Sequence, residues 1–142
     1  MTSGLFFSSE SDEPSRAQRA LRVLIADDER DIVLTLMAIL RDEGYETKGV
    51  YSGKDVLAAV AEFDPDAVLL DIAMPGMTGW DVARQIRRLH PGDRPRLVAL
   101  SGQYTQGADK ILAQMTGFDG YLTKPCDPKV IVALLATTDR PA

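Results

Sequence analysis

Four short apolar segments of this chain each end on a polar residue that can bind a metal ion or a phosphate group. The segments are Val23–Ala26 before Asp27 and Asp28, Ala67–Leu70 before Asp71, Leu97–Leu100 before Ser101, and Gly120–Thr123 before Lys124. Continuous apolar segments of this length are typical of strands that are buried on both faces of a parallel sheet. Segments with helical spacing of apolar residues separate them, which predicts an α/β fold with right-handed crossovers.

The polar residues that follow these strands are expected to meet in space. In a parallel sheet the carboxyl ends of all strands lie along one edge, where ligands bind in a crevice. Asp27, Asp28 and Asp71 would repel one another there unless a cation lay between them. Carboxylates without a nearby His or Cys favour a hard ion such as Mg²⁺. Lys124 and Ser101 then suit an anion bound beside the metal.

Five strands and five helices are expected from Leu21 onward. The short, half-polar strand 46–50 suits a sheet edge. The expected helices are about 30–43, one that begins at Ser52 and ends before Pro65, one that follows Gly79, about 106–115, and one that begins at Asp127 and Pro128.

The third and fourth helices carry specific expectations about burial. In the third, the spacing predicts that Val82, Ile86 and Leu89 face inward and that Arg84, Gln85, Arg87 and Arg88 are mostly solvated. The fourth has only three large apolar anchors, so it is expected to be among the less stable elements. These anchors are Ile111, Leu112 and Met115.

Composition excludes several classes of protein. The chain has 142 residues, a net charge of −5 and a pI near 4.8. This acidic balance argues against nucleic acid or an anionic membrane as the main partner. A local basic patch is still compatible with the positions of Arg84, Arg87 and Arg88. One cysteine, Cys126, fits a reducing compartment. No segment approaches the ~18 apolar residues of a membrane span, so a cytoplasmic location without membrane insertion is expected.

Residues 1–20 differ from the rest of the chain, because they are rich in serine and acidic residues and lack sustained periodicity. We expect a flexible tail or linker there, or the remnant of an upstream domain. One folded domain is expected over residues 21–137, followed by a short tail over 138–142. Without a further recognisable domain after it, the chain reads as either a stand-alone domain or a piece of a longer protein.

Five ordered motifs closely resemble the receiver domain of two-component response regulators. They are Asp27-Asp28, Asp71, the segment Met74-Pro75-Gly76-Met77-Thr78-Gly79, Ser101-Gly102, and Tyr121 three residues before Lys124-Pro125. The resemblance covers roughly Leu21 to Ala136. It implies a flavodoxin-like, doubly wound fold with a five-stranded parallel sheet in the order 2-1-3-4-5 and helices on both faces. It also favours a cis bond between Lys124 and Pro125.

The charge pattern and the resemblance together assign a role to each site residue. Asp28, Asp71, the backbone carbonyl of Ala73, and Asp27 through water are expected to hold Mg²⁺. Asp71 would accept the phosphoryl group, while Lys124 and Ser101 bind its oxygens. Ser101 and Tyr121 would form the conformational switch, whose output face consists of the fourth helix, the last strand and the last helix.

The resemblance implies that a sensor histidine kinase or a phosphotransfer domain is the donor. The chain is then not an enzyme beyond its own phosphorylation and dephosphorylation. A weak homodimer is left open, and the output target is unknown. Two alternatives are a degenerate receiver that acts only as an interaction module and a haloacid-dehalogenase-like phosphatase, although Ala73 stands where such a phosphatase needs a second acid.

Single residues have structural alternatives. Asp28 could merely favour a helix N-terminus, Asp71 could begin a turn, Ser101-Gly102 could form a loop, and Tyr121 could belong to the core. Lys124 has no evident structural task. The ordered set favours function over these separate explanations.

Overall fold

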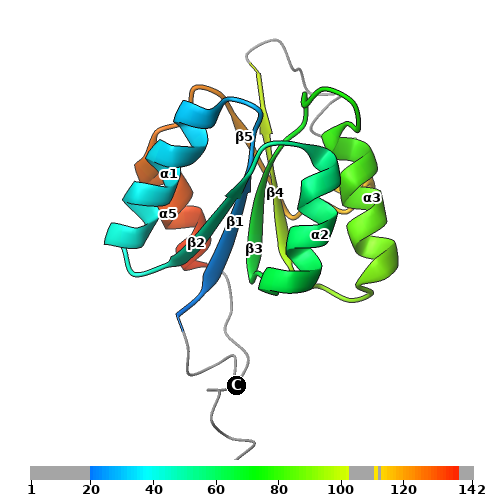
Figure 1. The fold of residues 1–142 in the computed structure, drawn as a ribbon, viewed down its shortest axis with the longest axis horizontal. Coiled ribbons are helices and arrows are strands. Elements are labelled where there is room, and N and C mark those ends of the chain that lie inside the picture. Colours follow the sequence, from blue (N-terminus) through cyan, green and yellow to red (C-terminus); the bar gives the residue numbers. More distant parts are fainter. Residues whose placement is uncertain (1–19, 103–110, 112, 138–142) are drawn as a thin grey trace, which may run out of the picture.

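The computed structural model describes residues 20–102, 111 and 113–137 of the chain, which form one layered α/β domain (Figure 1). The strands are β1 (Arg22–Ala26), β2 (Glu46–Val50), β3 (Ala67–Asp71), β4 (Arg96–Ser101) and β5 (Gly120–Thr123). The helices are α1 (Arg30–Asp42), α2 (Gly53–Phe63), α3 (Gly79–Leu89) and α5 (Pro128–Ala136). The expected fourth helix lies largely outside the described residues.

The five strands form one parallel sheet in the order β2-β1-β3-β4-β5, which confirms the predicted fold class and strand order. In this register Ala26 at the end of β1 lies beside Leu70 of β3, and Ser101 at the end of β4 lies beside Thr123 of β5. The half-polar β2 occupies one edge of the sheet, as predicted. All strand carboxyl ends therefore lie along one edge.

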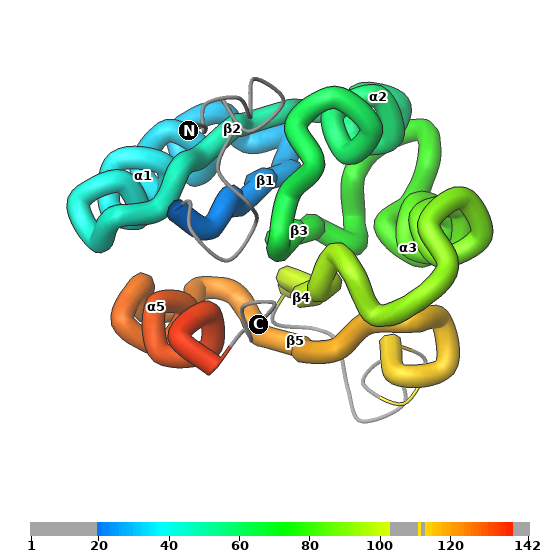
Figure 2. Tube along the Cα trace, turned by 90° about the horizontal axis from the view of Figure 1, so that it is seen from below, coloured from blue at the N-terminus to red at the C-terminus, as the bar shows by residue number. Residues whose placement is uncertain are grey.

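Two helical layers cover the sheet. Helices α1 and α5 lie on one face, and α2 and α3 lie on the other (Figures 1 and 2). Alternate residues of each strand point to opposite faces, so β1 sends Val23 and Ile25 to the α1/α5 side and Leu24 and Ala26 to the α2/α3 side. Each face thus has its own apolar core, and the strands are buried on both sides.

Side-chain caps fix where three helices begin. Ser52 accepts a hydrogen bond from the Asp55 backbone N–H at 3.3 Å, and Thr78 accepts one from Asp81 at 3.3 Å. Asp127 accepts one from the Lys129 N–H at 2.9 Å, with Pro128 in the first turn. These bonds satisfy backbone donors that have no partner within the helix. The starts of α2, α3 and α5 follow the sequence expectation for this reason.

Burial in the third and fourth helices departs from the prediction at several positions. Leu89 is 60% exposed rather than inward, because α3 ends there, beyond the part of the helix that covers the sheet. Arg87, expected in solvent, instead turns inward and bonds three acceptors. Of the expected anchors of the fourth helix, Ile111 and Met115 are exposed. Ala113 is buried in this segment, and the third expected anchor, Leu112, lies outside the described residues.

The Lys124-Pro125 peptide bond is cis, as predicted, and the Arg94-Pro95 bond is cis as well, which the sequence did not indicate. Within the described part of the chain, no helix is both long and apolar enough to cross a membrane.

Candidate functional site

The three aspartates predicted to form a cluster lie together at the carboxyl edge of the sheet. Each of Asp27, Asp28 and Asp71 offers a carboxylate oxygen, and these oxygens lie within 4.8 Å of one another. Asp71 is the last residue of β3, and Asp27 directly follows β1, held in place by a bond from its N–H to the Val50 carbonyl at 3.2 Å. Asp27 and Asp71 are buried, whereas Asp28 is exposed. The cluster is therefore open to solvent on the Asp28 side.

Lys124 supplies the positive charge in this cluster. Its Nζ lies 2.6 Å from Oδ2 of Asp27 and 3.3 Å from Oδ2 of Asp71. Burial acts to lower the pKa of Lys124, but the hydrogen bond to Asp27 and the charges of Asp71 and Asp27 outweigh it and raise that pKa. The ammonium is consequently charged at neutral pH. One cation faces three carboxylates, which leaves the cluster with an excess of negative charge.

Asp71 holds a proton more readily than an ordinary aspartate. Burial raises its pKa to about 6, and the negative charge of Asp27 acts in the same direction. The Ala73 N–H, which donates to Oδ1 of Asp71 at 3.1 Å, and the ammonium of Lys124 oppose this rise. At neutral pH the carboxylate is ionised. Its burial leaves it less solvated than an ordinary surface carboxylate, which favours reaction as a nucleophile.

Ser101 and Tyr121 are in direct contact. The two hydroxyl oxygens lie 2.9 Å apart, and either can be the donor. Ser101 is the last residue of β4 and is buried, while Tyr121 on the neighbouring strand β5 is half-buried and packs against the α2/α3 core. The ring of Tyr121 thus packs against the core while its hydroxyl contacts Ser101, and its role as a switch stays a prediction. Sequence reasoning placed the two residues near each other but did not indicate this bond.

Gly79, which the sequence motif contained without a stated role, sets the distance between α3 and the site. Its N–H donates to the Ile72 carbonyl at 2.9 Å. A Cβ at this position would lie 2.6 Å from the Ile72 Cα and 2.9 Å from the Asp71 carbonyl oxygen. Only glycine permits this approach, so α3 begins in direct contact with the backbone of the strand that carries Asp71. Ala73 lies in the intervening turn.

The donor set fits a hard divalent cation. Carboxylate oxygens are the protein ligands that Mg²⁺ prefers, and it commonly takes only one or two carboxylates from the protein and completes its shell with water and phosphate oxygens. The exposed Asp28 and the buried Asp71 supply such a pair within 4.8 Å. Because the cluster with Lys124 retains an excess of negative charge, a divalent ion would also relieve the repulsion among the carboxylates.

A mainly apolar groove of about 670 Å³ opens beside the site. It lies between α1 and the start of α5, and Lys124 and Pro125 form one side of it. Its apolar wall includes Leu36, Leu100 and Ile131. The sequence did not indicate this groove, because the groove depends on the distance between two helices that are far apart in the chain.

Comparisons with known proteins agree with this geometry. The family model of the response regulator receiver domain matches residues 23–136. The DNA-binding response regulator MtrA of Mycobacterium tuberculosis is 38% identical over 112 residues, which are 79% of this chain and 47% of that protein. MtrA of Mycobacterium leprae is likewise 38% identical and is covered to 48%. The chain spans about half the length of these curated relatives.

Solved structures with the same fold include the chemotaxis protein CheY4 of Vibrio cholerae, with a TM-score of 0.78 and 26% identity over 84% of this chain and 99% of that one. A CheY-like response regulator receiver domain protein of Methanospirillum hungatei has a TM-score of 0.76 and 26% identity, over 82% of this chain and 91% of that chain. The sheet order, the aspartate cluster and the family match lead to one conclusion: this chain belongs to the family of response regulator receiver domains.

Proposed function

We propose that this receiver domain accepts a phosphoryl group on Asp71 in the presence of Mg²⁺ and changes its output face in response. The observation that carries the proposal is the placement of a buried, ionisable carboxylate at a strand end, within 4.8 Å of two further aspartates and 3.3 Å from an ammonium. This is the arrangement of charges that phosphoryl transfer requires: a nucleophile, ligands for a cation, and a donor for the phosphoryl oxygens.

The proposed reaction transfers the phosphoryl group from a phosphohistidine to a carboxylate. An oxygen of Asp71 attacks the phosphorus in line with the leaving imidazole, the P–N bond breaks, and its electron pair returns to the ring nitrogen. A Mg²⁺ ion held by Asp28, Asp71, the Ala73 carbonyl and, through water, Asp27 would neutralise charge on the phosphoryl oxygens. The chain acts here as a phosphoacceptor and is not an enzyme for other substrates.

Lys124 and Ser101 bind the transferred group in this proposal. The ammonium of Lys124, which neutralises Asp27 and Asp71 before transfer, is close enough to Asp71 to contact a phosphoryl oxygen afterwards. The Ser101 hydroxyl can donate to a second oxygen, because Ser101 is the last residue of β4, the strand adjacent to β3. Such a bond would compete with its present contact to Tyr121, so phosphorylation changes the environment of the tyrosine hydroxyl.

The phosphodonor is proposed to be a sensor histidine kinase or a phosphotransfer domain. The groove between α1 and α5 supports this, because it offers an apolar contact surface directly beside Lys124. The proposal includes no direct binding of this domain to nucleic acid, in keeping with its net charge of −5. Of the three arginines at 84, 87 and 88, Arg87 bonds acceptors inside the fold and so does not contribute to a basic surface patch.

A small acyl phosphate tests the proposal without knowledge of the kinase. In the presence of Mg²⁺ it should add one phosphoryl group that is stable in acid and labile in base, and Asp71→Asn should abolish the addition. The matched control is Asp55→Asn, because Asp55 is exposed in the first turn of α2. Mass spectrometry locates the modification. Phosphorylation on Ser101 or any other hydroxyl, or unchanged labelling of Asp71→Asn, would contradict the proposal.

A further inference from the structure

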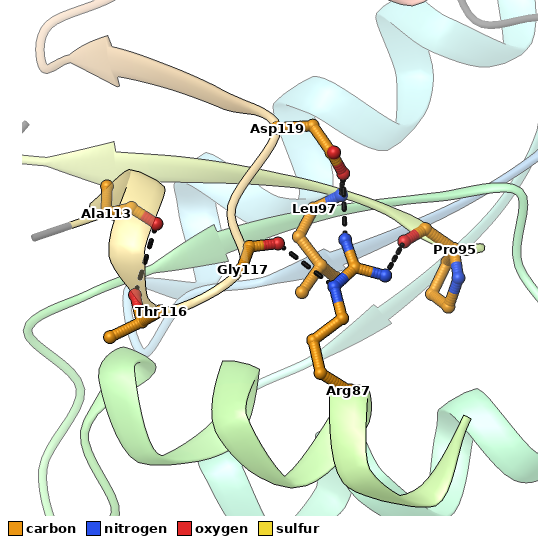
Figure 3. A network of polar contacts seen from close by, with 7 residues as sticks. All are labelled: Arg87, Pro95, Leu97, Ala113, Thr116, Gly117 and Asp119. Atoms are coloured by element: carbon orange, nitrogen blue, oxygen red, sulfur yellow. Dashed lines mark hydrogen bonds and ion pairs between the residues drawn. The ribbon is translucent and has the colours of Figure 1, made fainter. Parts of the chain in front are cut away.

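Arg87 joins three parts of the chain that are far apart in the sequence (Figure 3). From the last turns of α3, its Nε donates to the Gly117 carbonyl at 3.0 Å, Nη1 to the Pro95 carbonyl at 2.8 Å, and Nη2 to Oδ2 of Asp119 at 2.8 Å. The side chain is 19% exposed. A planar guanidinium can make these three bonds in different directions at once, whereas a lysine ammonium cannot reproduce the fork.

The acceptors of Arg87 lie just before the strand that carries the switch tyrosine. Asp119 also accepts from the Leu97 N–H at 2.9 Å, and its own N–H donates to the Leu97 carbonyl at 2.7 Å. Asp119 is followed by Gly120 and Tyr121 of β5. The guanidinium and the start of β4 therefore fix the backbone two residues before Tyr121 from two sides.

Gly117 shows that the chain is fitted around the arginine. It has a φ of +103°, and a Cβ there would lie 2.8 Å from Cγ of Arg87. A second contact between α3 and this segment lies about two helical turns away, where the Trp80 and Phe118 rings meet edge to face with centroids 5.9 Å apart. The segment before β5 is thus held along the length of α3.

Helix α3 is also in contact with the phosphoacceptor strand. Gly79, its first residue, packs against the backbone of Asp71 and Ile72. A continuous series of contacts therefore runs from Asp71 through α3 and Arg87 to the start of β5, separate from the direct bond between Ser101 and Tyr121.

We propose that Arg87 is a positioning residue of the switch: it fixes the start of β5 so that the Tyr121 hydroxyl meets the Ser101 hydroxyl. The inference rests on the proposed function, because it gives a role to the same pair of residues. When phosphorylation draws the Ser101 hydroxyl away, the anchored backbone under Tyr121 does not follow, and the tyrosine side chain alone must respond. Without the anchor, β5 would follow Ser101 and the two states of Tyr121 would differ less.

Hydrogen exchange on the unphosphorylated protein tests the anchor first. In Arg87→Met the amides of 118–123 should exchange at least about ten times faster than in the wild type, while those of β1 and β3 stay unchanged. Arg84→Met is the matched control, because Arg84 lies on the same helix and pairs only with exposed Asp81 in the contacts described. An unchanged exchange rate at 118–123 would overturn the proposal. An equal increase of the exchange rate in every strand would also overturn it, because Arg87 would then stabilise the whole fold and not the start of β5 in particular.

Phosphorylation with an acyl phosphate tests the positioning role itself. The wild type and Arg84→Met should show a several-fold difference in exchange at 118–123 between the phosphorylated and free states. In Arg87→Met this ratio should fall to about 1, although Asp71 is labelled within about twofold of the wild-type extent. An undiminished ratio would overturn the proposal. If the wild type is not labelled at all, the proposed function fails, and the exchange of the unphosphorylated protein still decides on the anchor.

Two further variants keep the test valid if Arg87→Met does not fold. Arg87→Lys keeps the charge but cannot bond all three acceptors, so it should make exchange at 118–123 faster than in the wild type, as Arg87→Met does. Asp119→Asn removes the ion pair and leaves an oxygen for the Leu97 N–H, so it should have a smaller effect of the same sign. If the amides of 118–123 exchange at the wild-type rate in both variants, Arg87 does not have the proposed role.

Discussion

The two buried aspartates share one ammonium, and this sharing lowers the cost of burying their negative charges. Asp27 is fully buried, yet one of its oxygens accepts from the Glu29 N–H at 2.9 Å and the other contacts Lys124 at 2.6 Å. A buried charge is tolerated only when it is paired and hydrogen-bonded. Lys124 therefore has a structural task after all, since its ammonium neutralises the buried carboxylates of Asp27 and Asp71.

Asp71 makes the stability of the metal-free protein depend on pH. Its pKa is raised from an ordinary value of 3.8 to about 6, so between these values the folded state binds more protons than the unfolded state. The contribution of this group to the free energy of unfolding should therefore be greatest below pH 4, fall as the pH rises to about 6, and stay constant above. The Asp71→Asn variant cannot ionise at this position, so its stability should not fall in this pH range. At pH 7 its free energy of unfolding should exceed that of the wild type by at most about 3 kcal/mol.

Denaturant unfolding in the presence of a chelator, at pH 4 and at pH 7, measures this effect. The gain in stability from Asp71→Asn should be present at pH 7 and largely absent at pH 4, and Asp55→Asn should show no such difference. A gain that is the same at both pH values would show that burial does not perturb the ionisation of Asp71.

At the scale of the element, α3 begins in direct contact with the backbone of Asp71 and Ile72. Gly79→Ala should place a methyl group 2.6 Å from the Ile72 Cα, so either the turn after Asp71 or the whole helix must move. We expect a loss of about 1–3 kcal/mol in the free energy of unfolding, together with slower phosphorylation of Asp71. Gly102→Ala is the control, since a Cβ at that position has no neighbour within 4 Å. Equal stability of the two variants, measured in denaturant, would contradict this close contact.

The sequence predicted the elements well because strand ends, caps and breakers are local signals. It predicted side-chain burial in helices less well, since periodicity indicates a face but not where the covering sheet ends. Leu89 is exposed for this reason. Arg87 was misread because a charged side chain on a helix is usually solvated, and its three acceptors come from segments 8 to 32 residues away in the chain.

The sequence predicted which residues of the candidate site lie close together. Because the carboxyl ends of parallel strands lie at one edge of the sheet, Asp27, Asp71 and Lys124 were expected to lie close together at that edge. The structure places the three side chains in contact. It could not indicate which carboxylate Lys124 contacts more closely, or that Ser101 and Tyr121 bond directly, because these depend on rotamers and on the register between β4 and β5. The roles of these residues in phosphoryl transfer stay predictions.

At the scale of the whole molecule, binding of Mg²⁺ should stabilise the fold. The aspartate cluster forms only when β1 and β3 pair, so the unfolded chain lacks the site. At a hundred times its dissociation constant, an ion that binds only the folded form adds about 2.7 kcal/mol, or on the order of 10 °C in Tm for a domain of this size. A chelator should reverse the shift. Thermal melting measures it, and Asp28→Asn should weaken it strongly.

Asp28→Asn is informative because Asp28 is the exposed member of the cluster and has a small structural role. The control is Asp31→Asn in the first turn of α1, which also removes an acidic residue near a helix start. A Tm that is indifferent to millimolar Mg²⁺, or one that shifts equally in both variants, would rule out this cluster as the binding site.

The layered architecture places both ends of the fold on the same side. The chain enters the sheet at Arg22, at the edge where the amino ends of the strands lie. Helix α5 runs back from the opposite, carboxyl edge and ends at Ala136 (Figure 1). Asp71 lies at the opposite edge. Any sequence joined before β1 or after α5 therefore starts out away from Asp71. A domain with this geometry can be placed at either end of a longer polypeptide, or between two other domains, and still leave the aspartate cluster uncovered.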